Sequence, residues 1–80
     1  MKKVIRVQTG VRLEKTLLKV LKATAEYCEL SLGDLLEGIV LHAFEGECAF
    51  GPETRKKIEQ LRQVYGLELS AADSHQLTES

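Results

Sequence analysis

The chain has 80 residues, of which 44% are hydrophobic, and its 11 Lys and Arg against 12 Asp and Glu give a formal net charge of −1 at pH 7. This length limits the protein to one small domain, whose core is small enough that we expect a second subunit to complete it. Two cysteines are too few for a disulfide framework, and the sequence contains no run typical of a signal peptide or a membrane span. We therefore expect a soluble, cytoplasmic protein with reduced thiols.

The charges are arranged in blocks. Residues 1–25 carry seven Lys or Arg and one Glu, a net charge of +6, whereas residues 26–54 carry seven Asp or Glu and no Lys or Arg, a net charge of −7. Clustered cations attract polyanions even when the whole chain is nearly neutral. The first block therefore predicts a segment that binds nucleic acid.

Residues 4–13 alternate in polarity, with mostly apolar side chains at odd positions and mostly polar ones at even positions. A period of two predicts a half-buried β-strand. No other stretch of the chain predicts a strand, and an unpaired strand leaves its backbone N–H and C=O groups without partners. We therefore expect its partner strand to come from a second copy of the chain.

Two helices are expected next. Over about residues 14–28, apolar side chains recur at helical spacing, at Leu17, Leu18, Leu21, Ala25 and Cys28. A second helix begins at Ser31, with Asp34 three residues later in the pattern of a capping box. Its apolar residues, from Leu32 to Phe44, form a surface too wide for a helix with one solvated face, which also indicates a dimer core.

The remainder predicts a linker, a third helix and a short acidic tail. Pro52 suits the first turn of the third helix and Gly66 its end. A narrow apolar stripe runs along this helix, through Ile58, Leu61, Val64 and Tyr65. Ser70 with Asp73 predicts one further turn.

The order of basic strand, helix and helix resembles the ribbon-helix-helix DNA-binding family of the Arc and methionine repressors. The similarity covers residues 4–44. It rests on residues 11–13, on the apolar positions that follow them and on residues 30–36. The resemblance implies a mainly α fold with one N-terminal strand paired across an intertwined homodimer, two core helices and here a C-terminal third helix. Residues 1–45 would form the DNA-binding and dimerisation domain, and residues 46–80 the linker, third helix and tail.

The implied function is that of a sequence-specific transcriptional regulator, such as a repressor, that inserts an antiparallel β-ribbon into the major groove of double-stranded DNA. By this resemblance the base-reading residues are Arg6, Gln8, Gly10 and Arg12. Arg pairs well with guanine and Gln with adenine, whereas Gly10 departs from the pattern because it offers no side chain. The alternative is that Arg6 and Arg12 only keep a two-stranded ribbon soluble.

The resemblance also implies phosphate binding at the start of the second helix, at Ser31, Leu32 and Gly33, and free N–H groups at a helix start do favour an anion. Lys15 and Lys19, with Lys22, extend this footprint or else form a solvated helix face. The alternative for Ser31 is an ordinary helix cap. Two features weaken the site: Glu29 stands where the family usually has Gly, and Asp34 adds negative charge.

Other chemistry has little support in the sequence. The four Cys and His residues that a zinc ion would need are Cys28, His42, Cys48 and His75, and their spacing matches no paired ligand pattern. No nucleophile has a nearby base and no phosphate-binding loop occurs, so we expect no enzyme activity, metal or cofactor.

The alternative function is protein binding, with DNA binding secondary or absent. Antitoxins with ribbon-helix-helix domains bind a toxin through a C-terminal extension, and residues 52–80 would be such an extension. The same residues would otherwise cap apolar surface on the dimer. We expect an exposed third-helix stripe in the first case and a stripe packed on the second helix in the other.

Overall fold

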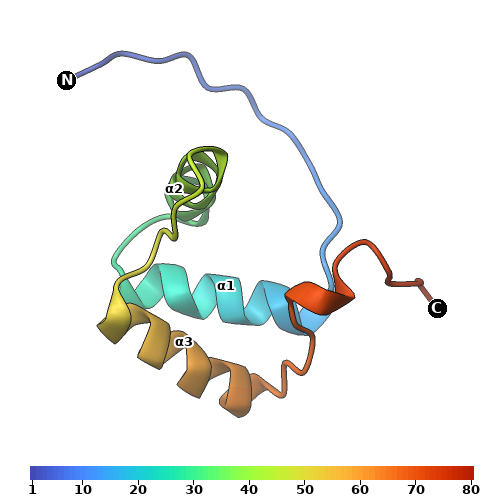
Figure 1. Cartoon of the computed structure of the whole chain (residues 1–80). Coiled ribbons are helices and arrows are strands. Elements are labelled where there is room, and N and C mark those ends of the chain that lie inside the picture. The colour runs from blue at the N-terminus through green and yellow to red at the C-terminus, as the bar shows by residue number, and fades with distance from the viewer.

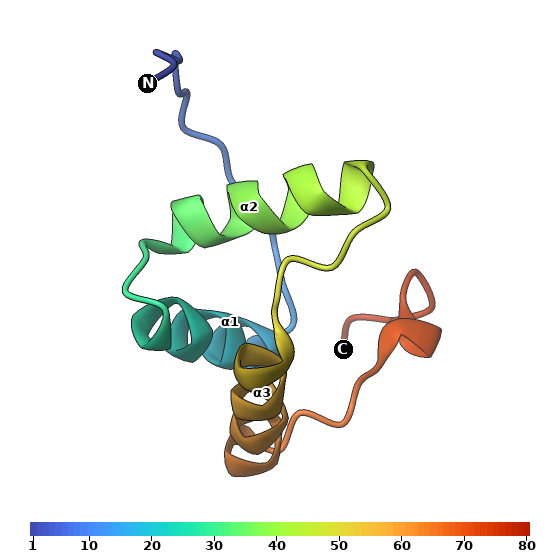
Figure 2. The ribbon, with the colours of Figure 1, turned by 60° about the vertical axis from the view of Figure 1, so that its left-hand side comes forward.

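The computed structural model describes all 80 residues and contains three α-helices and one short 3₁₀ turn (Figure 1). The elements are α1 (Lys15–Tyr27), α2 (Leu32–Phe44), α3 (Pro52–Tyr65) and η1 (Ala71–Asp73). Among the helices, α1 packs more extensively against α3 than against α2, and α2 packs against α1 but not against α3. Figure 2 shows α2 crossing over the α1–α3 pair. None of these helices has the length and apolar character needed to cross a membrane.

The predicted N-terminal strand is absent, and the chain contains no β-strand at all. The predicted ribbon-helix-helix fold class is therefore wrong, and with it the ribbon. Alternating polarity determines which side chains share a face, but it does not supply the second strand that a ladder requires. Residues 1–13, here called the N-terminal arm, are instead all exposed and run past α2 to the start of α1 (Figure 1). Water is free to bind their backbone groups there.

Both of the first two helices begin at the predicted positions. The Glu14 carboxylate accepts hydrogen bonds from the backbone N–H groups of Thr16 (3.0 Å) and Leu17 (2.9 Å), so α1 is capped by its preceding residue. These bonds and one from the Thr16 hydroxyl lower the pKa of Glu14. Ser31 caps α2, because its Oγ accepts from the Asp34 N–H at 3.1 Å. The sequence-predicted cap at Ser31 is confirmed.

The C-terminal elements also match their sequence signals. Pro52 is the first residue of α3. The turn η1 is closed by Ser70 and Asp73, whose carboxylate accepts from the Ser70 backbone N–H at 2.8 Å. Local capping chemistry is therefore sufficient to fix these boundaries.

All three α-helices end in the same way, in a motif that needs a left-handed residue just after the helix. The φ angles of these residues are 57° at Glu29, 71° at Gly46 and 71° at Gly66. After α1, for example, the Leu30 N–H donates to the Ala25 carbonyl at 2.9 Å, as in a Schellman motif. Glycine adopts this conformation without strain, but a glutamate does not. The α1–α2 turn is thus made without a glycine at its left-handed position.

The core of the single chain is small. Five residues are buried, and three of them lie in α1: Val20, Thr24 and Ala25. Leu35 of α2 and Leu67 after α3 complete the set. The Thr24 hydroxyl donates to the Val20 carbonyl at 2.7 Å, so the one buried polar side chain is satisfied.

α3 packs on α1 rather than on α2, which corrects the predicted location of the cap. Ile58 and Leu61 of its apolar stripe are half-buried, whereas Val64 and Tyr65 are exposed. The ammonium group of Lys57 lies 5.6 Å from the centre of the Tyr27 ring and adds a cation–π contact between the two helices. These contacts favour the alternative in which α3 covers apolar surface of the chain. Binding of a protein partner by residues 52–80 stays a prediction.

Candidate nucleic-acid interface

The cations of the positive block, residues 1–25, are all exposed. Every Lys and Arg of this block lies at the surface, four in the N-terminal arm and three on α1: Lys2, Lys3, Arg6, Arg12, Lys15, Lys19 and Lys22. On α1 the three lysines recur at steps of four and three residues, which places them on one side of the helix. The arm and this side of α1 together form a continuous cationic segment of the chain.

Arg6 anchors the arm to α2. Its Nε and Nη2 atoms each donate to a carboxylate oxygen of Glu37, both at 2.9 Å, and its Nη2 lies 3.9 Å from Oδ1 of Asp34. The hydrogen bonds to Glu37 and its negative charge raise the pKa of Arg6. The same hydrogen bonds and the positive charge of Arg6 lower the pKa of Glu37. All three side chains remain well exposed, so water and salt screen this pairing.

The second arm arginine has an acidic partner of its own. Arg12 Nη2 donates to Oε2 of Glu79 at 2.9 Å, which brings the C-terminal tail to the arm. Gln8 and Gly10, between the two arginines, are exposed. No atom would contact a Cβ at Gly10, so the glycine is not explained by close packing within the chain.

The start of α2 lies near the arm because Arg6 contacts the first turns of this helix. Ser31 and Gly33 are exposed and Leu32 is half-buried. The Ser31 hydroxyl is engaged in the cap, whereas the N–H groups of Leu32 and Gly33 have no acceptor in the chain, as is usual for a first helical turn. The structure therefore brings Arg6 to the predicted phosphate-binding turn, whereas Arg12 lies with the C-terminal tail.

Three acidic residues lie in this region without having been predicted as partners of the arm. The sequence assigns Asp34 only to the cap of α2 and to a weakening of phosphate binding. It assigns no role to Glu37 and Glu79. The opposite charges of residues 1–25 and 26–54 were a general sign of such pairing. Sequence spacing did not identify the pairs, because Arg6 and Glu37 are separated by 31 positions and Arg12 and Glu79 by 67. In the unbound chain these carboxylates occupy the two guanidinium groups that we expected to contact DNA.

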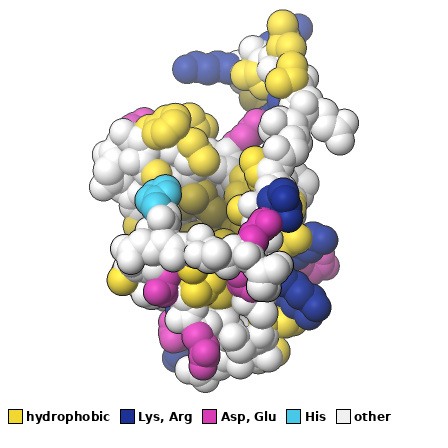
Figure 3. All heavy atoms as spheres, turned by 90° about the vertical axis from the view of Figure 1, so that its right-hand side faces the viewer, with side chains coloured by type: hydrophobic (Ala, Val, Ile, Leu, Met, Phe, Trp, Pro, Cys, Tyr) yellow, Lys and Arg dark blue, Asp and Glu magenta, His cyan; other side chains and the backbone are white.

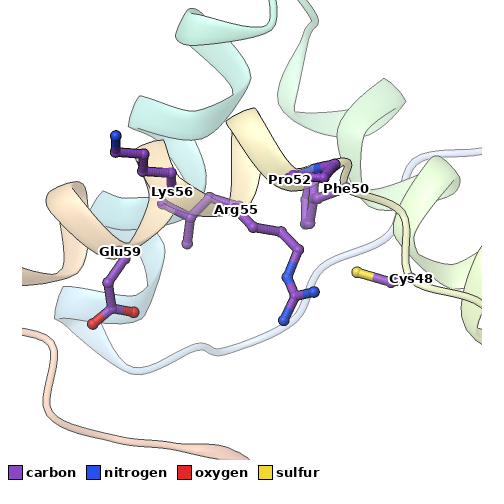
Figure 4. A pocket seen from close by; sticks show the side chains of 7 residues that line it. Cys48, Phe50, Pro52, Arg55, Lys56 and Glu59 are labelled. Carbon is purple, nitrogen blue, oxygen red and sulfur yellow. The ribbon is translucent and has the colours of Figure 1, made fainter.

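The cysteines and histidines are dispersed. No group of three or more His, Cys, Asp or Glu side chains is close enough to hold a metal ion. Cys48 lines a shallow surface pocket of about 590 Å³ between the α2–α3 linker and α3, with Phe50, Pro52 and Arg55 among its neighbours (Figure 4). This pocket shares no residue with the N-terminal arm.

Comparison of the chain with protein-family models, curated proteins and solved structures finds no match. The most pronounced feature of the chain is its cationic N-terminal segment.

Proposed function

We propose that this chain is a cytoplasmic, nucleoid-associated DNA-binding protein and transcriptional regulator, and that its N-terminal arm contacts the duplex. The observation that carries this proposal is the exposure of all seven Lys and Arg of residues 1–25, four on an arm without regular secondary structure and three on α1. Neutralising phosphates with such cations releases condensed counterions and drives binding. An extended basic arm is also slim enough to enter a groove of DNA.

Within the arm, Arg6, Gln8 and Arg12 are the side chains with the chemistry to contact base edges. Arg donates two hydrogen bonds to guanine and Gln pairs with adenine, each contributing about 1–3 kcal/mol of discrimination. Gly10 lies between them and allows the backbone to approach the bases closely. Because Arg6 and Arg12 are held by carboxylates in the free chain, DNA must displace Glu37 and Glu79.

Phosphate contacts would come from the helices. Lys15 and Lys19 follow the arm directly on the exposed side of α1. The unpaired N–H groups of Leu32 and Gly33 lie at the start of α2, close to the Arg6 contact. Asp34 repels phosphate at this point, so we assign the larger part of the binding free energy to the cations of residues 1–25.

The proposal is tested by titrating labelled duplex DNA with the protein at several salt concentrations and following fluorescence anisotropy. We expect the affinity to fall steeply with salt, with a logarithmic slope of about −0.9 for each phosphate neutralised. Arg6→Ala and Arg12→Ala should weaken binding, whereas Arg55→Ala, which removes an exposed arginine of α3, should not. Equal binding by all three variants, or none by the unmodified chain at low salt, would overturn the assignment.

A further inference from the structure

The C-terminal tail, residues 67–80, carries the opposite charge to the N-terminal arm. It contains Glu68, Asp73 and Glu79 and no Lys or Arg, whereas the arm contains four cations and no Asp or Glu. In Figure 1 the tail turns back beside the point where the arm joins α1. Figure 3 views the molecule from this side and shows acidic and basic side chains next to one another on it. The tail therefore lies beside the middle of the cationic segment that we assign to DNA binding.

The first part of the tail, residues 67–73, is fixed to the helices. Leu67 is 6% exposed, and its backbone N–H donates to the Arg62 carbonyl at 2.8 Å. In return, the Nη2 atom of Arg62 donates to the Leu69 carbonyl at 2.7 Å. The turn η1 follows directly. The rest of the tail thus starts from a fixed point at the end of α3.

The last part of the tail, residues 74–80, is held to the arm by one ion pair. Arg12 Nη2 donates to Oε2 of Glu79 at 2.9 Å, and no other side-chain hydrogen bond or ion pair joins this part to the arm or to an α-helix. Leu77 and Leu17 of α1 line a hollow of about 350 Å³ nearby, but Leu77 is 56% exposed. The two partners of the ion pair are also largely exposed, and such pairs are weak. Little free energy is therefore needed to release residues 74–80.

A weak contact still competes with DNA when it lies within one chain. The fixed start of the tail keeps the Glu79 carboxylate close to Arg12, so its effective concentration there is on the order of millimolar. The carboxylate occupies a guanidinium donor that a guanine or phosphate oxygen would use. It also neutralises a cation whose contact with phosphate releases counterions from DNA. Arg12 therefore cannot bind the tail and DNA through this donor at the same time.

We propose that residues 74–80 form an autoinhibitory segment, which holds Arg12 in the free chain and leaves it when DNA binds. This inference rests on the proposed function and adds a form of regulation to it. Residues 67–73 stay on the helices in the complex, whereas residues 74–80 become free. The affinity for DNA is then set by the tail as well as by the arm. Any change that withdraws the tail carboxylate raises this affinity.

Glu79→Gln tests the inhibitory contact, because it removes the charge and keeps the shape of the side chain. An exposed ion pair is weak, so we expect duplex DNA to bind about two- to fivefold more tightly at low salt. Glu68→Gln is the matched control, because it removes the same charge from the same tail at an exposed position without an ion pair. Equal gains in the two variants would overturn the proposal, since the tail would then act only through its net charge.

Combining Glu79→Gln with Arg12→Ala shows whether the two side chains act together. Without Arg12 the contact does not exist, so Glu79→Gln should then leave the affinity for DNA nearly unchanged. A gain of the same size with and without Arg12 would overturn the proposal.

A second measurement follows the tail in the unmodified protein. We expect the backbone amide heteronuclear NOE of residues 74–80 to fall when a short duplex is added, whereas that of Leu67 and Leu69 stays high. An unchanged value for residues 74–80 in the complex would overturn the proposal. The two proposals fail in different ways. Absence of DNA binding by every variant would refute the proposed function, whereas binding that Glu79→Gln does not alter would refute the autoinhibition alone.

Discussion

Arg6 and Glu37 form a two-pronged contact in which both guanidinium donors lie 2.9 Å from the carboxylate oxygens. This contact fixes the N-terminal arm to the first turns of α2, and it uses the donor edge with which an arginine would bind guanine or phosphate. A side chain assigned to DNA contact is therefore already paired in the free chain. The competition between Glu37 and DNA leads to the first prediction.

Replacing Glu37 by Gln should strengthen DNA binding. The substitution removes the charge that holds Arg6 while keeping the shape of the side chain. Exposed ion pairs are weak, so we expect a gain of about two- to fivefold in affinity at low salt. Glu26→Gln is the control, because it makes the same charge change at an exposed position of α1 outside the Arg6 contact. Anisotropy titrations in which both variants gain equally would show a general charge effect and contradict the specific competition.

The same ion pair should respond to acid. The pKa of Glu37 lies below the ordinary glutamate value because Arg6 stabilises its charged form. The contact is therefore complete above about pH 4.3 and is lost as the pH falls through the lowered pKa. An NMR titration of the Glu37 side-chain carboxyl carbon should give a lower midpoint in the unmodified chain than in Arg6→Ala. Identical midpoints would show that the two side chains do not pair in solution.

Glu29 should be a position where glycine increases stability. Its φ of 57° lies in the left-handed region, where a Cβ costs about 1–2 kcal/mol. Glu29→Gly removes this strain but adds backbone freedom to the unfolded chain, so we expect a net gain of about 1 kcal/mol in the free energy of unfolding. Glu29→Ala retains the Cβ and should show no comparable gain in urea denaturation. A glycine variant less stable than the alanine variant would contradict the left-handed geometry.

Leu67 tests the contribution of the C-terminal segment to the fold. It is 6% exposed and follows the left-handed Gly66 at the end of α3, which directs the chain back toward α1. Leu67→Ala should lower the free energy of unfolding by about 2–4 kcal/mol, as expected for a truncated core leucine. Leu77→Ala is the comparison, since Leu77 is 56% exposed and its loss should cost little. Similar stabilities of the two variants would mean that the tail does not contribute to the core.

The structural features that were predicted correctly depend only on residues close together in the sequence. The cap at Ser31, the first turn at Pro52 and the end of α3 at Gly66 are local features, and each occurs where it was expected. Their geometry is determined within four or five residues, so periodicity and capping residues are sufficient to place them.

The features that sequence reasoning missed depend on distant residues. The alternation of residues 4–13 predicted a strand, but a ladder needs a partner strand that the chain does not contain. The pairing of Arg6 with Glu37 joins positions far apart in the sequence. The narrow stripe of α3 showed that the helix packs on one side, but it did not show that α1 rather than α2 covers that side.

We expect the exposed cationic segment of residues 1–25 to bind DNA and its arm to discriminate between sequences. The decisive experiment is selection of bound fragments from a pool of random duplexes at a stated salt concentration. We predict enrichment of a defined motif that is lost in the Arg6→Ala, Arg12→Ala double variant. A pool that remains random after repeated rounds at every salt concentration would show that the chain does not recognise a DNA sequence.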